Sequence, residues 1–281
     1  MISNKYKIIE LINHGSFGSI FKCINTHTNK LVAIKTEPKD TDKKTLKNEA
    51  RIYQYLGNTN GFPQLQYFGA TLTHNYLVMD LLGTSLSSMI KRYQTLSLKT
   101  VLFIGIQIIN RIQTLHSKFL LHRDIKTDNF VFENKQPTNK LYLIDLGFSK
   151  RYTYDGLHIP ENSINTIIGT PNFVSLNNHN GVEPSRRDDL ESAIYIILNM
   201  FFGNLEWFNY INIFDIVKLK KKLILQPNTP PFIKTMLHYV ISLRFNELPD
   251  YNFIINIMND LIDHNGYKND NVFEWTNDLT I

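Results

Sequence analysis

The chain has 281 residues, of which 43% are hydrophobic and 20% are charged, and this composition suits one large globular domain or two lobes. Its net charge of +5 is compatible with acidic or phosphorylated partners, but it is too weak a bias to indicate a nucleic-acid binder. A single cysteine, Cys23, excludes an intramolecular disulfide and a cysteine-based zinc cluster. We therefore expect an intracellular protein, in the cytoplasm or the nucleus.

Neither a secretion signal nor a membrane span is expected from the apolar segments. The first residues, "MISNKYKIIEL", lack the apolar core and the cleavage site of a signal peptide. The most apolar stretch, residues 194–202, is about half as long as the roughly 20 residues that a membrane-spanning helix needs. A helix that is apolar on every side and this short is expected to be buried in a protein core.

The first 80 residues predict mostly short strands separated by turns, and the first three of these strands predict an antiparallel meander. Strands are predicted over residues 6–12, 19–24, 31–35, 64–70 and 75–82, which are rich in Ile, Val, Phe and Tyr. Between them, residues 43–56 predict one amphipathic helix, because Leu46, Ala50, Tyr53 and Leu56 recur every three or four positions.

From Ser85 onward the apolar periodicity becomes helical. Helices are predicted over residues 100–116, 192–202, 213–223, 231–243 and 251–264. The sequence thus predicts an α+β fold with a small β-rich N-terminal lobe, residues 1–82, and a larger helical C-terminal lobe, residues 83–281. Together they form one domain, and the cleft between two lobes is a favoured place for a ligand.

Residues 12–21, "INHGSFGSIF", contain two glycines three positions apart, Gly15 and Gly18, between apolar residues. This pattern is typical of a loop whose backbone approaches a phosphate, although alone it also fits an ordinary hairpin turn. Asn13 stands where the G-x-G-x-x-G pattern has its first glycine. Because asparagine tolerates a positive φ angle, we expect Asn13 to take much of the glycine conformation and Phe17 to cover the phosphates.

The third predicted strand ends in a lysine, Lys35, and the helix that follows carries Glu49 among its apolar positions. A lysine at the end of a strand is commonly a solvated side chain. The alternative is an ion pair from Lys35 to Glu49, which would hold the ammonium towards the glycine loop, ready to meet phosphate oxygens.

The strongest motif is "HRDIKTDN", residues 122–129, between the long helix and a short strand. Transfer of a phosphoryl group to a hydroxyl needs a proton acceptor, a cation near the moving group and ligands for magnesium. Asp124, Lys126 and Asn129 supply these in order, and Asp145 at the end of the next strand supplies a second magnesium ligand. The alternatives are a polar turn and a common Asp-x-Gly turn, but the order and spacing favour the catalytic interpretation.

These residues are those of the protein-kinase signature set, and the chain resembles a protein kinase over essentially its whole length. Ser175, Leu176 and Asn177 stand where most protein kinases have Ala-Pro-Glu, and this substitution is similar to the casein kinase 1 group. Vaccinia-related kinases are the nearest neighbours of the pattern, but they typically have glycine where this chain has Arg123. The other segments that resemble the casein kinase 1 group are 181–192, 242–251 and 272–278.

The resemblance implies a bilobal monomer with ATP and Mg²⁺ between the lobes, which transfers the γ-phosphate to Ser or Thr of protein substrates. It implies that Met79 guards the back of the adenine pocket, that residues 80–83 form the hinge, and that Asp189 braces the catalytic loop. The residues implied to contact the nucleotide are Ile12, Gly15, Ser16, Phe17, Gly18, Ile20, Ala33, Lys35, Met79, Asp80 and Leu82.

Three further positions depart from the resemblance. Leu146 replaces the phenylalanine that usually follows the metal-binding aspartate, and Asn172 and Asn165 stand where the casein kinase 1 group has an arginine and tends to have a lysine. The arginine binds phosphate on a substrate that is already phosphorylated. The cations that remain for a substrate anion pocket are Lys218, Arg123 and Lys150. We therefore expect tolerance of unphosphorylated substrates and a mild preference for acidic ones.

Two other functions remain open. A pseudokinase scaffold would be favoured by loss of a catalytic residue, but Lys35, Asp124, Asn129 and Asp145 are all retained. A nucleic-acid or anionic-surface binder would use the basic run at 218–222, which is usually only a solvated helix face.

Overall fold

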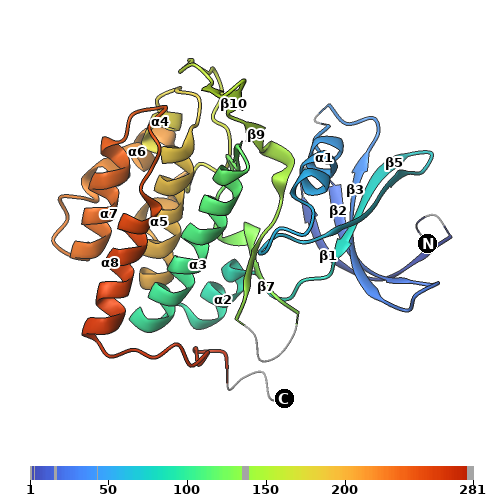
Figure 1. Ribbon diagram of the computed structural model, residues 1–281, viewed down its shortest axis with the longest axis horizontal. Coiled ribbons are helices and arrows are strands. Elements are labelled where there is room, and N and C mark those ends of the chain that lie inside the picture. Colours follow the sequence, from blue (N-terminus) through green and yellow to red (C-terminus); the bar gives the residue numbers. More distant parts are fainter. Residues whose placement is uncertain (1, 3, 16–17, 43, 135–138, 277–281) are drawn as a thin grey trace.

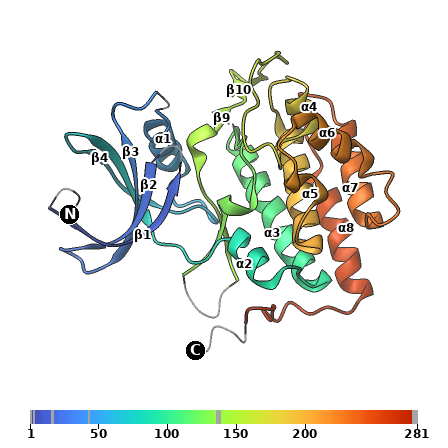
Figure 2. The same ribbon diagram turned by 180° about the vertical axis from the view of Figure 1, so that it is seen from behind.

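The computed structural model describes residues 2, 4–15, 18–42, 44–134 and 139–276. The N-terminal part is a five-stranded antiparallel sheet with the strand order β1-β2-β3-β5-β4, and one helix packs beside it (Figure 1). This confirms the helix and the meander predicted for the first three strands, whereas β5 rather than β4 pairs with β3. The elements are β1 (Tyr6–Gly15), β2 (Gly18–Asn25), β3 (Leu31–Pro38), α1 (Leu46–Leu56), β4 (Leu65–Ala70) and β5 (His74–Asp80). Figure 2 shows β4 at the edge of the sheet.

The strand register sorts the side chains of the sheet onto two faces. Lys35 pairs with Ile20 on β2 and with Leu77 on β5, and Ala33 pairs with Met79. Because paired residues, and residues two apart in a strand, point to the same side, these five side chains share one face. The face therefore brings the strand lysine together with several residues implied to contact the nucleotide.

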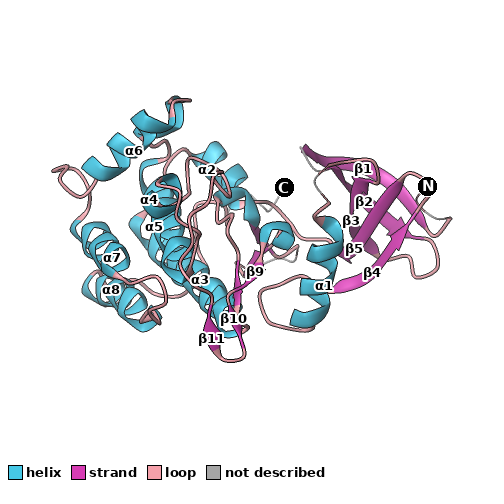
Figure 3. Ribbon diagram, turned by 90° about the horizontal axis from the view of Figure 1, so that it is seen from above, coloured by secondary structure: helices cyan, strands magenta, loops and turns pink. Residues whose placement is uncertain are grey.

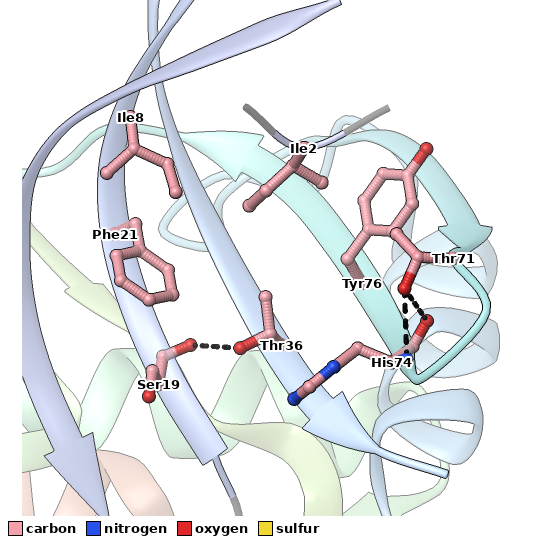
Figure 4. A pocket seen from close by; sticks show the side chains of 8 residues that line it. All are labelled: Ile2, Ile8, Ser19, Phe21, Thr36, Thr71, His74 and Tyr76. Carbon is pink, nitrogen blue, oxygen red and sulfur yellow. Dashed lines mark hydrogen bonds between the residues drawn. The ribbon is translucent and has the colours of Figure 1, made fainter. Parts of the chain in front are cut away.

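The opposite face of the sheet carries a separate apolar cluster. It contains Cys23, whose side chain is fully buried, and its other members are Ile2, Tyr6, Val32, Ile34, Tyr76 and Val78. A shallow cavity of about 300 Å³ lies beside this cluster, with Phe21, Thr36 and His74 in its lining (Figure 4). Thr36 and Lys35 are neighbours on one strand and so point to opposite faces. The cavity is therefore not the nucleotide site.

The C-terminal part is a bundle of helices around α3 and α5, as the view from above shows (Figure 3). Nearly every residue of α5 is buried, as expected for a helix that is apolar on all sides. Among the described residues, no helix is both long and apolar enough to span a bilayer. The helices are α2 (Leu86–Tyr93), α3 (Leu98–Ser117), α4 (Leu176–His179), α5 (Arg186–Phe202), α6 (Ile213–Lys222), α7 (Pro231–Ser242) and α8 (Tyr251–His264).

Short elements between α3 and α4 carry the predicted catalytic residues on the side of the bundle that faces the sheet (Figure 1). They form two-stranded pairs, β6 with β9, β7 with β8 and β10 with β11. The elements are β6 (Leu120–Leu121), η1 (Thr127–Asn129), β7 (Phe130–Phe132), β8 (Leu141–Leu143), η2 (Leu146–Phe148), β9 (Lys150–Arg151), β10 (Thr153–Tyr154) and β11 (Leu157–His158); η3 (Glu206–Asn209) precedes α6.

Candidate active site

Lys35 connects the sheet, helix α1 and the C-terminal part. Its Nζ lies 2.8 Å from Glu49 Oε2, so the ion pair predicted from the sequence is present. The same Nζ lies 2.7 Å from Asp145 Oδ1. Glu49 is almost completely buried and 13% of the Lys35 side chain is exposed, whereas 31% of the Asp145 side chain is exposed. Lys35 is therefore fixed in place, and Asp145 presents part of its carboxylate to the space between the lobes.

Lys35, Glu49 and Asp145 shift one another's pKa values. Burial alone would raise the pKa of Asp145, but the ammonium of Lys35 outweighs burial and holds this pKa below its ordinary value. Burial alone would lower the pKa of Lys35, but the carboxylates of Glu49 and Asp145 raise it above its ordinary value. At neutral pH both Lys35 and Asp145 are therefore charged, as contacts with phosphate and with a cation require.

Asp124 lies almost fully buried in the loop between β6 and η1. Its Oδ2 lies 2.8 Å from Nζ of Lys126, and its Oδ1 accepts a hydrogen bond of 2.8 Å from the hydroxyl of Thr170. Lys126 also donates to Thr170 Oγ1 at 3.2 Å. The structure thus brings the predicted proton acceptor and the predicted cation together. Thr170 was not identified from the sequence, because no local pattern marks a hydroxyl 46 residues away.

Asn129 and Asp145 lie on neighbouring segments, since the backbone N–H of Ile144 donates to the carbonyl of Asn129 at 2.9 Å. The Asn129 amide group donates to the carbonyl of Asp124 at 2.8 Å, which leaves the Asn129 side-chain oxygen as the acceptor. An amide oxygen and an anionic carboxylate are suitable ligands for a hard divalent cation. The donor set therefore fits Mg²⁺, which Asn129 and Asp145 would hold.

Asp189, near the start of α5, binds the backbone of the catalytic loop, as the resemblance implied. Its Oδ2 accepts from the backbone N–H of His122 at 2.8 Å, and its Oδ1 accepts from the backbone N–H of Arg123 at 2.9 Å. His116 Nε2 lies 3.0 Å from the same carboxylate. Arg123 has a φ of 68°, a conformation that non-glycine residues seldom adopt. The buried carboxylate therefore holds a strained loop that presents Asp124.

The glycines of this segment end one strand and begin the next, and Gly15 on β1 pairs with Gly18 on β2. Gly18 has a φ of 142°, and a Cβ there would lie 1.7 Å from the carbonyl oxygen of Thr36, so only glycine fits. Asn13 pairs with Ile20 as part of strand β1 and is not among the described residues with positive φ. The expectation of a glycine-like conformation at Asn13 was wrong, because the strand pairing already accommodates an ordinary residue.

The other residues implied to contact the nucleotide are distributed along the same region. Ser16 and Phe17 lie outside the described residues. Ile12 is half exposed on β1, while the Leu82 side chain is partly buried. The Asp80 carboxylate accepts hydrogen bonds from Gln64 N and Gln66 Nε2, at 3.0 and 3.1 Å. The Asp80 side chain thus fixes the end of β5 to the segment before β4 and to β4 itself.

The three cations predicted for a substrate anion pocket have different surroundings. Lys150 forms an ion pair with Glu183, and Nε of Arg123 donates to the carbonyl of Phe148 at 2.7 Å. Lys218 is exposed on α6. The partners of Lys150 and Arg123 given above do not lie on α6, so these contacts do not bring Lys218 together with the other two cations. The pocket therefore stays a prediction.

A neighbouring lysine on α6, Lys220, is buried instead. Its Nζ donates to the carbonyls of Pro171 and Val174, at 3.0 and 2.7 Å, and lies 4.6 Å from the centre of the Tyr195 ring. These carbonyls follow Thr170 in the chain, so Lys220 fixes the segment beside Asp124. The sequence did not predict this role, because four of the five residues at 218–222 are lysines and the pattern does not show which lysine is buried.

His179, at the end of α4, provides a test of this buried cluster. Its Nε2 lies 3.3 Å from Lys220 Nζ, and burial together with the lysine charge lowers the pKa of His179 to about 4. The unfolded imidazole titrates near about 6.5. Protons therefore favour the unfolded state, and the stability that the neutral imidazole contributes should fall as pH decreases from about 6.5 to about 4.

The measurement is the melting temperature as a function of pH. We expect His179→Gln to flatten the curve over this range, and His264→Gln, on the exposed end of α8, to keep the wild-type slope. Equal slopes in wild type and His179→Gln would contradict the assignment.

Comparison with known sequences defines the class of protein. Residues 6–248 match the family model described as protein kinase domain, so the chain belongs to the protein kinase family. Within that family it is similar to casein kinase I homolog 2 of Schizosaccharomyces pombe, with 37% identity over 284 residues. The alignment covers 96% of this chain and 65% of that relative. The resemblance to the casein kinase 1 group and the bilobal α+β fold are thereby confirmed.

Proposed function

We propose that the protein is an ATP-dependent serine/threonine protein kinase of the casein kinase 1 type, which acts on Ser and Thr hydroxyls of protein substrates. The observation that carries this proposal is the buried carboxylate of Asp124, paired with Lys126 and anchored to Thr170. The Lys35–Asp145 ion pair provides the charges for phosphate and metal contacts. The backbone N–H of Gly83 donates to Phe132, which supports a lobe boundary near Leu82.

Each residue has a defined part in the transfer. The acceptor oxygen forms a bond to the γ-phosphorus, the bond from that phosphorus to the ADP oxygen breaks, and Asp124 accepts the hydroxyl proton. Lys126 neutralises charge on the transferred group, while Lys35 holds the remaining phosphates. When bound, Mg²⁺ would neutralise phosphate charge, with Asn129 and Asp145 as its protein ligands.

The test is incubation of the purified protein with labelled ATP, Mg²⁺ and a library of Ser- and Thr-containing peptides. We expect label on serine and threonine, and none when the metal is removed with a chelator. ATP binding without transfer to any peptide would favour a pseudokinase. Binding to polyanions that weakens steeply with salt and ignores ATP would favour an anionic-surface protein instead.

We further propose that the enzyme has little need for phosphate already present on its substrate. Arginine binds phosphate through two parallel hydrogen bonds, and Asn172 cannot replace that charge or geometry. Lysines such as Lys218 attract phosphate only as point charges, so a mild preference for acidic peptides should remain and fade with salt. The observation behind the proposal is the sequence at 172 itself.

The prediction concerns the ratio of kcat/KM for paired phosphorylated and unphosphorylated peptides. Asn172→Arg should raise this ratio by about tenfold, which corresponds to about 1.4 kcal/mol, and Lys218→Ala should lower whatever preference exists. A ratio on the order of a hundredfold in the wild type would mean that other residues build the pocket.

A further inference from the structure

Helix α6 and the residues before it expose an apolar surface that the proposed catalysis does not use. Ile211 is 99% exposed and Phe214 is 85% exposed, with Tyr210 and Ile213 beside them at 41% and 39%. Single exposed apolar side chains are ordinary on protein surfaces, but four within five residues concentrate exposed apolar surface at the start of α6. Burial in the core does not explain these side chains, because the described structure leaves them in contact with solvent.

The same helix continues the patch with positive charge. Counting from Phe214, the exposed residues Lys218, Lys221 and Lys222 recur at helical spacing, and Leu225, 81% exposed, follows them. From Phe214 to Lys222 the helical part of this stripe is about 12 Å long at 1.5 Å per residue. We call the surface made by Tyr210, Ile211, Phe214, Lys221, Lys222 and Leu225 the α6 face. Its acidic neighbours Glu206 and Asp215 lie towards its apolar end.

The opposite side of α6 is connected to the catalytic loop. Lys220 holds the carbonyls of Pro171 and Val174, and Trp207 just before the helix donates from Nε1 to the carbonyl of Asn172 at 2.9 Å. Thr170, the residue before Pro171, contacts Asp124. A segment bound on the α6 face would therefore lie on a helix that directly supports the substrate side of the active site.

We propose that the α6 face is a docking surface for a protein segment that carries apolar anchors flanked by aspartate and glutamate. The apolar end would bury the anchors, and the exposed lysines match acidic flanks by charge complementarity. Docking rests on the proposed function in one respect. A bound segment would hold an acceptor hydroxyl of the same polypeptide near Asp124 and so raise the effective concentration of that hydroxyl there.

The first experiment measures binding without ATP. A displayed library of short peptides, each with two positions drawn from Phe, Leu and Ile and the others from Asp, Glu, Lys, Arg, Ser and Gly, is selected on the full chain. Enriched peptides are then synthesised with a fluorophore, and their Kd is measured by fluorescence anisotropy. We expect enrichment of Asp and Glu around the anchors, and binding that weakens as salt rises.

Variants localise the binding site. The double variant Ile211→Ser/Phe214→Ser should raise Kd by about tenfold or more, and Lys221→Glu/Lys222→Glu by about threefold or more. Leu72→Ser is the matched control, because Leu72 is 97% exposed on the turn between β4 and β5, and it should leave Kd unchanged. Melting temperatures confirm that all variants fold. Enrichment of basic or neutral peptides, or an unchanged Kd in the Ile211/Phe214 variant, would overturn the proposal.

The α6 face could instead bind a second copy of the chain or a lipid surface, and either result would overturn the proposal. A dimer in analytical ultracentrifugation that Ile211→Ser/Phe214→Ser dissociates would assign the face to a second copy of the chain. Co-sedimentation with phosphatidylserine-containing vesicles that is lost in the same variant, without any enriched peptide, would assign it to a lipid surface.

A second experiment joins docking to catalysis. An enriched peptide fused through a flexible linker to an acceptor peptide should have a KM about tenfold lower than the acceptor alone in wild type, but not in Ile211→Ser/Phe214→Ser. If neither peptide is phosphorylated by any form of the protein, the proposed function fails while the anisotropy data still decide the docking surface. If both are phosphorylated with equal KM in the wild type, the docking role fails while the proposed function stands.

Discussion

Asp124→Asn is expected to lower kcat by about 10²- to 10⁴-fold, the range that a positioned proton acceptor contributes. The amide cannot accept the hydroxyl proton, although it fits the same space between Lys126 and Thr170. ATP affinity should stay near the wild-type value, because Asp124 acts on the acceptor rather than on the nucleotide. Steady-state kinetics and equilibrium binding of ATP with Mg²⁺ measure the two quantities separately.

The control for this substitution lies four residues further on. Asp128 is exposed within the same segment, so Asp128→Asn should leave kcat close to wild type. Asp145→Asn should differ from both, because it removes charge from the predicted metal ligand and weakens nucleotide binding as well as turnover. A wild-type kcat in Asp124→Asn would exclude Asp124 as the proton acceptor.

Asp189→Asn should destabilise the protein by about 3 kcal/mol or more and also lower kcat. The carboxylate accepts from two backbone N–H groups and lies against His116, all in a fully buried position. An asparagine offers only one oxygen, so its NH₂ group must face an N–H or the His116 ring. Since the same bonds hold Arg123 at a φ of 68°, the catalytic loop should relax and displace Asp124.

Chemical denaturation with a two-state fit gives the stability change, and kcat measured well below the melting temperature gives the effect on the loop. Asp260→Asn is the control, since Asp260 is exposed on α8 and should change neither quantity. If Asp189→Asn loses stability but keeps the wild-type kcat, the carboxylate supports the core without positioning the loop.

Sequence reasoning located the catalytic residues because their chemistry is local. Asp124, Lys126 and Asn129 lie within six residues, and Lys35 and Asp145 each end a predicted strand, so residue type and spacing were enough to propose their catalytic roles. The fold class followed from the change of apolar period near Ser85, from the strand period to the helical one.

Contacts between distant residues could not be predicted in the same way. The start of α1 is held by Glu37 of β3, which accepts from the backbone N–H groups of Thr45 and Leu46 at 2.7 and 2.9 Å. The apolar spacing predicted the helix over residues 43–56, whereas α1 begins at Leu46. The contacts of Thr170 and Lys220 were not predicted for the same reason, since each side chain has its partner more than 40 residues away.

The apolar cluster on the face of the sheet opposite Lys35 has a consequence for spectroscopic work on this chain. Its Cys23 thiol is fully buried, and burial raises the pKa of Cys23 to about 11, so almost none of it is in the reactive thiolate form at neutral pH. Cys23 is also the single cysteine of the sequence. A cysteine introduced at an exposed position such as Leu72 would therefore take up a maleimide dye or spin label alone. The distance between the two lobes could then be followed with two such labels in the otherwise native chain.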